Sequence, residues 1–220
     1  DWIATPGTTL DVWPRFFTRN GRVVVTPDWW SNTLGNARAI RVYLPPSYDE
    51  NPDRAFPVVY LHDGQNLFPG DANFGGQSWE AAAAMDGGAA SGAIREAILV
   101  GIDNTDARMS EYTPTADPDY GGGGGGAYLA FVIDEVRPWV DATYRTLEGP
   151  ASTGILGSSL GGLISAYAGV RRPDVFGLIG VLSPSTWWDG RMLVNEVGSI
   201  PYRDSRALRV YVDTGDTGAE

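Results

Sequence analysis

Short hydrophobic runs recur along the chain, separated by turns rich in glycine, proline and polar residues, and each run predicts one element. Residues 57–61 and 97–102 are apolar throughout, which is typical of strands buried on both faces of a parallel sheet. Residues 40–44 alternate between apolar and polar positions, the period of a half-buried strand. Further strands are expected at 23–25, 153–156, 176–182 and 208–212.

Apolar residues at helical spacing predict helices between these strands. The strongest pattern covers residues 128–144, and Pro138 inside it is expected to kink or restart the helix. The recurring apolar positions are Leu129, Val132, Val136, Trp139 and Val140. Shorter helices are expected at 79–85 and after residue 160.

Two segments lack such patterns and are expected to be loops. They cover residues 27–36 and 103–126, and the second ends in six glycines, 121–126, which we expect to form a mobile loop. Strands that alternate with helices predict an α/β fold with a mostly parallel central sheet. We expect residues 1–220 to form a single domain.

One tight turn carries candidate chemistry. Gly157, Ser159 and Gly161 form a G-x-S-x-G pattern between an apolar strand and a helical pattern. In this context a serine is held in a strained conformation with its hydroxyl exposed above the sheet, and Ser159 is therefore the candidate nucleophile. The N–H of Leu160, at the start of the helix, is a candidate donor to developing negative charge. The alternative is a structural Gly-Ser turn.

A catalytic serine needs a general base, normally a histidine, which a carboxylate orients. In this architecture the acid follows a late strand and the histidine comes after it. Asp213, Asp216 and Glu220 all follow the 208–212 run, but His62, the one histidine of the sequence, precedes Ser159. We therefore expect His62 to shape its own loop. The C-terminal part of the domain, with the base, is expected beyond residue 220.

The loop after residues 57–61 is the candidate source of a second donor to the substrate oxygen. It reads His62-Asp63-Gly64-Gln65-Asn66, and in folds of this kind the loop after the third strand completes the oxyanion hole. Gly64 lets the backbone turn, so the N–H of Gln65 is the candidate. The alternative is an ordinary turn.

The amino-acid composition disfavours or excludes several kinds of binding partner and site. The sequence has 27 acidic residues against 16 basic ones, a net charge of −11, which disfavours nucleic acid and anionic membrane surfaces. It has no cysteine, which excludes disulfides and thiolate metal sites. No apolar run approaches the ~18 residues of a transmembrane helix.

Four sequence blocks, in one order, resemble the esterase branch of the α/β-hydrolases. That branch includes esterase D-like enzymes, enterochelin and bacillibactin esterases, and feruloyl or acetylxylan esterases. The blocks are residues 42–46 (VYLPP), 60–68 (YLHDGQNLF), 101–104 with Arg108 and 111–114, and 157–162 (GSSLGG).

The resemblance implies an α/β-hydrolase fold and ester hydrolysis through an acyl-enzyme on Ser159. It also implies oxyanion donors at Gln65 and Leu160, and no metal or organic cofactor. Asp216 and Glu220 both fit the position of the family's acid, and we favour Glu220. The family's catalytic histidine lies in a C-terminal segment that this sequence does not contain.

The resemblance also places candidate substrate-binding residues around the mouth of the site. Trp79, Trp187 and Trp188 would offer aromatic surfaces to sugar rings or aryl acyl groups, although all three would suit a core equally well. Arg108 is a candidate for binding a substrate carboxylate or phenolate, and Glu111 is its alternative, structural partner.

Two other functions stay open beside the serine esterase. One is a non-catalytic α/β-hydrolase-like module that binds sugar or aryl ligands, and the other is an acyltransferase that uses the same acyl-enzyme. The expected substrate is a small-molecule or saccharide ester, of feruloyl or siderophore type. The first residue, which is not methionine, and the aromatic richness favour a secreted protein.

Overall fold

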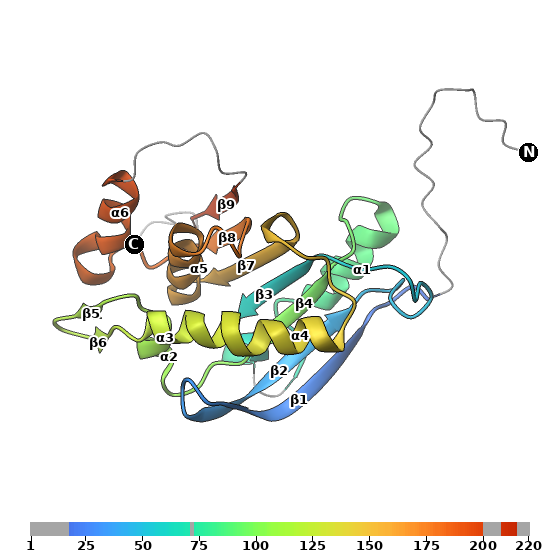
Figure 1. The fold of residues 1–220 in the computed structure, drawn as a ribbon, viewed down its shortest axis with the longest axis horizontal. Helices are drawn as coiled ribbons and strands as arrows, with labels where there is room; N and C mark the ends of the chain where they lie inside the picture. Colours follow the sequence, from blue (N-terminus) through green and yellow to red (C-terminus); the bar gives the residue numbers. More distant parts are fainter. Residues whose placement is uncertain (1–17, 71–72, 200–207, 215–220) are drawn as a thin grey trace, which may run out of the picture.

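The computed structural model describes residues 18–70, 73–199 and 208–214, and a seven-stranded sheet forms their centre (Figure 1). The strand order is β1-β2-β4-β3-β7-β8-β9. β1 and β2 pair antiparallel at one side, and β4, β3, β7, β8 and β9 run parallel. The strands are β1 Arg22–Ser31, β2 Asn36–Leu44, β3 Val58–His62, β4 Ile98–Ile102, β7 Thr153–Ser158, β8 Leu178–Leu182 and β9 Arg209–Asp213. The predicted α/β class with a mostly parallel sheet is confirmed.

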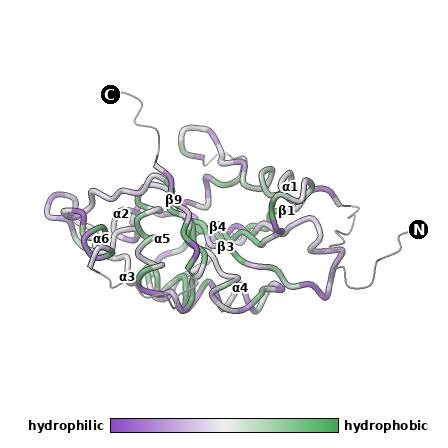
Figure 2. Tube along the Cα trace, turned by 90° about the horizontal axis from the view of Figure 1, so that it is seen from above, coloured by the Kyte–Doolittle hydropathy of each residue, from purple (hydrophilic) through white to green (hydrophobic). Residues whose placement is uncertain are grey.

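Helices cover both faces of this sheet. On one face, α3 (Gly125–Ala130), a π-helical turn (Phe131–Val136) and α4 (Arg137–Thr143) form a continuous rod beside α5 (Leu160–Arg171). This face holds the larger core, where strand residues such as Val42, Tyr60 and Ile155 meet the helices. α1 (Ala81–Ser91) packs on the other face, over a smaller cluster that includes Leu61 and Leu99. Figure 2 shows hydrophobic residues gathered in the central strands and α5.

The remaining elements lie in the connections. They are 3₁₀ turns at Gly64–Asn66, Phe74–Gly76 and Pro150–Ser152, the short helix α2 (Arg108–Glu111), the small hairpin β5 (Ala116–Asp117) and β6 (Gly121–Gly122), and α6 (Trp188–Ser199). None of the helices in the described part of the chain is both long and apolar enough to cross a bilayer.

Two local expectations, the loops at 27–36 and 103–126, differ from the structure. Residues 27–31 belong to β1, which passes through an irregularity in its pairing between Thr26 and Trp29; Pro27 has no N–H for the ladder, and this hid the strand. The segment 103–126 contains α2, the β5–β6 hairpin and the start of α3; of its six glycines, two lie in β6, two in the connection at 123–124 and two in α3. The expectation at Pro138 is met in part: a π-helical turn ends at Val136 and α4 begins at Arg137, which puts Pro138 in the first turn of α4, where a missing N–H is tolerated.

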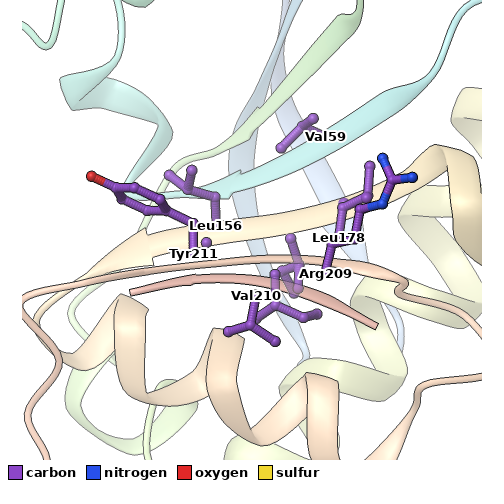
Figure 3. Close-up of a pocket in the computed structure, with 10 residues that line it drawn as sticks. Val59, Leu156, Leu178, Arg209, Val210 and Tyr211 are labelled. Atoms are coloured by element: carbon purple, nitrogen blue, oxygen red, sulfur yellow. The ribbon is translucent and has the colours of Figure 1, made fainter. Parts of the chain in front are cut away.

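An apolar hollow of about 330 Å³ lies on the sheet face that α1 only partly covers (Figure 3). The glycines 154 and 180 leave room at its floor. The side chains around it are those of Val59, Leu156, Leu178, Arg209 and Tyr211. The candidate nucleophile, Ser159, does not line this hollow.

Candidate active site

Ser159 occupies a strained turn between β7 and α5. Its φ of 57° and ψ of −121° lie in a region that non-glycine residues rarely adopt, and such strain persists only where the surroundings enforce it. The Ser159 N–H donates to Leu182 O on β8 at 3.0 Å. Leu160 is the first residue of α5, so its N–H has no acceptor within the helix.

Close backbone approaches around Ser159 explain the glycine pattern. A Cβ on Gly157 would lie 2.6 Å from the carbonyl carbon of Gly161 and 2.8 Å from Cδ2 of His62. A Cβ on Gly162 would lie 3.0 Å from the carbonyl oxygen of Leu182. Only residues without a side chain allow the strand, the turn and the helix to approach this closely.

A second serine contacts the candidate nucleophile. The Ser159 and Ser185 hydroxyl oxygens are 3.2 Å apart, and the Ser185 N–H donates to Ser159 O at 3.0 Å. Ser185 is buried and lies in the loop after β8. No motif in the sequence singles out Ser185, although its position just after a buried parallel strand is a signal for a residue at this edge of the sheet.

His62 lies beneath the turn and is fully buried. Its Nδ1 is 2.9 Å from the Tyr128 hydroxyl, and its Nε2 has no hydrogen-bond partner. Burial lowers the pKa of His62 to about 4, so the imidazole is neutral over most of the physiological range. Its ring occupies the space below Gly157, where an added Cβ would lie close to it, and its role in shaping the loop after β3 stays a prediction.

The loop after β3 forms the floor beside the turn. Asp63 adopts a left-handed conformation, with φ 56°, and its N–H donates to the Tyr112 hydroxyl at 3.1 Å. Gly64 presses on β4, where a Cβ would lie 2.6 Å from the carbonyl carbon of Gly101. Gln65 follows in the 3₁₀ turn. Because β3 and β7 are parallel neighbours, this loop and the Ser159 turn emerge at the same edge of the sheet.

Arg108 lies against this loop through an ion pair with Asp63. Its Nε and Nη2 atoms lie 2.7 and 2.9 Å from the two carboxylate oxygens, and this hydrogen bonding raises the pKa of Arg108. Glu111 does not pair with Arg108, contrary to the alternative considered above. It binds the buried Arg38 on β2 through two bonds of 2.8 and 2.6 Å.

The three tryptophans predicted at the mouth of the site differ in their exposure to solvent. Trp187 and Trp79 are 53% and 39% exposed. Trp188 is fully buried, and its Nε1 donates to Thr115 O at 2.9 Å, so the structure places it in the core and not at the mouth. The exposed Tyr120, on the β5–β6 hairpin, stacks edge-on against Trp187 with ring centroids 5.6 Å apart.

Of the three candidate acids, the structure describes Asp213 alone, at the end of β9. Its Oδ1 accepts from the Ser183 N–H at 3.2 Å, close to the Ser185 loop. Asp216 and Glu220 lie outside the described residues. No cluster of three or more histidine, aspartate or glutamate side chains that could hold a metal ion occurs within residues 18–70, 73–199 and 208–214.

Comparison with known proteins gives a consistent picture. A family model described as "Putative esterase" matches residues 31–220. The chain is 32% identical over 145 residues to a siderophore triacetylfusarinine C esterase of Aspergillus fumigatus, covering 64% of this chain and 48% of that protein. The chain spans between about a quarter and two thirds of the length of the curated relatives it matches.

Solved structures share the architecture. An IroE-like serine hydrolase from Shewanella oneidensis is 28% identical with a TM-score of 0.59, covering 80% of this chain and 55% of that one. A ferulic acid esterase is 26% identical with a TM-score of 0.60, covering 87% of this chain and 67% of that one.

Proposed function

The chain belongs to this esterase family and has the α/β-hydrolase fold, and on that premise we propose that it is the core of a carboxylic ester hydrolase with Ser159 as nucleophile. The observation that carries the proposal is the backbone of Ser159, strained at φ 57° between β7 and the first turn of α5. A serine held in this way presents its hydroxyl above the sheet.

In this mechanism the Ser159 oxygen attacks the ester carbonyl carbon as a base removes the hydroxyl proton. The carbonyl oxygen becomes an oxyanion, which the N–H groups of Leu160 and Gln65 stabilise. Collapse of the tetrahedral intermediate expels the alcohol, which takes up a proton, and leaves an acyl-enzyme. Water then attacks the acyl carbonyl and releases the acid and free Ser159.

The general base is proposed to come from a residue outside the 220-residue sequence. His62 is unsuited to the role, because it is buried below the turn and bonded to Tyr128 rather than to Ser159. The orienting acid would be Glu220 or Asp216, which follow β9 in the chain, or Asp213, which is its last residue.

The proposed substrates are esters of aryl or acyl groups linked to a sugar or a siderophore. Relatives named as siderophore and feruloyl esterases support this range, and so does the exposed aromatic pair Tyr120 and Trp187. Trp187 is two residues from Ser185, which contacts Ser159. We expect a planar ring to stack on this pair while its ester bond lies at Ser159.

The experiment is labelling of the protein that contains this chain with a fluorophosphonate probe, followed by mass mapping and an assay on a small nitrophenyl ester. A single adduct on Ser159 and loss of turnover in Ser159→Ala are expected. Ser158→Ala, which removes the neighbouring hydroxyl, is the matched control and should keep both properties.

Retained hydrolysis in Ser159→Ala would contradict the proposal. Saturable binding of a sugar or aryl ligand without labelling would instead favour a non-catalytic binding module. Ester exchange with an added alcohol in place of hydrolysis would indicate an acyltransferase built on the same acyl-enzyme.

A further inference from the structure

Gln65 is held from two sides by asparagine residues of other segments. Its side-chain Oε1 accepts from the Asn104 N–H at 3.1 Å, and its main-chain O accepts from Asn73 Nδ2 at 2.6 Å. The first bond holds the Gln65 side chain and the second holds the peptide that follows it, while Gly64 O, in the peptide that carries the Gln65 N–H, accepts from the Leu67 N–H at 3.2 Å. None of these three bonds uses the Gln65 N–H, the proposed oxyanion donor.

Asn104 also holds Asp63, the residue on the other side of Gly64. Its Nδ2 donates to Asp63 Oδ1 at 2.5 Å. The Asp63 carboxylate is buried, with its side chain 7% exposed, and it also binds Arg108. The carboxylate therefore stabilises an otherwise unfavourable backbone, since Asp63 has a positive φ.

Gly64 is pressed between these two anchored residues and the end of β4. A Cβ there would lie 2.6 Å from the carbonyl carbon of Gly101 and 2.7 Å from the Ile102 nitrogen. Asn104 follows β4 by two residues. One residue at the end of the neighbouring strand thus ties down both flanks of the turn, while the strand itself supports its centre.

We propose that Asn104 is a positioning residue that sets the direction of the Gln65 N–H in the oxyanion hole. This inference rests on the proposed function of the Ser159 site. The stabilisation of an oxyanion by a backbone N–H depends on a donor placed in advance, and displacement of a catalytic group by about 1 Å can reduce the rate by about 100-fold. Arg108 then has a structural role in the same loop, because it anchors Asp63. A substrate anion would have to compete with the Asp63 carboxylate to bind Arg108.

Two variants test the two hydrogen bonds that Asn104 makes, one to Asp63 and one to Gln65. Asn104→Ala removes the bond to Asp63, and Gln65→Leu removes the acceptor of the Asn104 N–H but keeps the Gln65 N–H. Each should lower kcat by about 10- to 100-fold with KM changed by less than about threefold. Asn195→Ala is the matched control, because it removes an asparagine at an exposed position of α6 whose Nδ2 donates to the carbonyl oxygen of Gly190.

The measurements are kcat, KM, the thermal midpoint and the rate of fluorophosphonate labelling of Ser159. A fall in kcat and in labelling rate, at constant KM and in a folded protein, supports the inference. Wild-type kcat in both variants, with Ser159 still labelled, overturns it and leaves the proposed function intact. A parallel loss of folding and activity in both variants overturns it in favour of a purely structural role. An unlabelled wild type overturns the proposed function, and the inference with it.

Discussion

The hydroxyl oxygens of Ser159 and Ser185 lie 3.2 Å apart, and the main chains of the two residues are also joined by a hydrogen bond. This double link ties the turn after β7 to the loop after β8, its parallel neighbour. The position of the Ser159 hydroxyl is therefore set from two strands at once. Ser185 supplies a hydrogen-bond partner for the proposed nucleophile within the described part of the chain.

Ser185→Ala should reduce kcat/KM for a nitrophenyl ester by roughly 2- to 10-fold. That range corresponds to the net value of one hydrogen bond, about 0.5–1.5 kcal/mol. Ser91→Ala, which removes a hydroxyl at the end of α1 that bonds to Gly87 O, should leave kcat/KM unchanged. Full activity in Ser185→Ala would mean that this contact does not orient the nucleophile.

Gly157→Ala should destabilise the protein and abolish most of its activity. The added Cβ would meet the Gly161 main chain and the His62 ring, and overpacking of this kind costs about 1–3 kcal/mol. The matched substitution is Gly126→Ala in α3, where a Cβ meets nothing within 4 Å; it should stabilise the helix by about 0.5–1 kcal/mol. Denaturant unfolding of both variants checks the contrast, and equal stabilities would contradict it.

His62 should make the protein less stable as the pH falls. Burial lowers its pKa to about 4 in the folded state, whereas an unfolded histidine titrates near 6.5. The unfolded state therefore binds the proton first. The contribution of His62 to the free energy of unfolding is fully present above about pH 6.5. It is lost as the pH drops toward 4, which lowers the free energy of unfolding by about 3 kcal/mol.

The variant His62→Gln isolates this effect, because glutamine does not titrate. Unfolding free energies of both proteins, measured between pH 7.5 and 4, should converge as the pH falls, whatever the carboxylates contribute to each curve. Parallel curves would show that His62 titrates alike in the folded and unfolded states.

Much of the sheet could be predicted because its strands are continuous apolar runs. Strands β3 and β4 lie inside the sheet and are covered on both faces. Their side chains are therefore almost all apolar, and each run can be recognised from the sequence alone. The second half of β1 was hidden by Pro27 and by Asp28, which has a positive φ. α6 was missed because three residues inside it, Asp189, Gly190 and Arg191, have left-handed backbones that no apolar period reveals.

Within the site, too, local features could be predicted, whereas contacts between distant segments could not. The turn at Ser159 could be predicted because its glycines contact one another within a few residues. The partner of Arg108 could not, because the choice between Asp63 and Glu111 depends on where distant segments meet. Trp187 and Trp188 are adjacent in sequence, and only the packing of the loop decides which one is buried.

Those two tryptophans should therefore respond differently to removal of the ring. Trp188→Ala deletes a fully buried indole and its bond to Thr115, which should cost about 3–5 kcal/mol of stability. Trp187→Ala deletes an exposed ring and should change the unfolding free energy by less than about 0.5 kcal/mol. It should instead raise KM by roughly 2- to 10-fold for an aryl or sugar ester, the value of one aromatic stacking contact. A small acetyl ester that cannot reach Trp187 is the control substrate, and an equal rise in its KM would remove Trp187 from the substrate-binding surface.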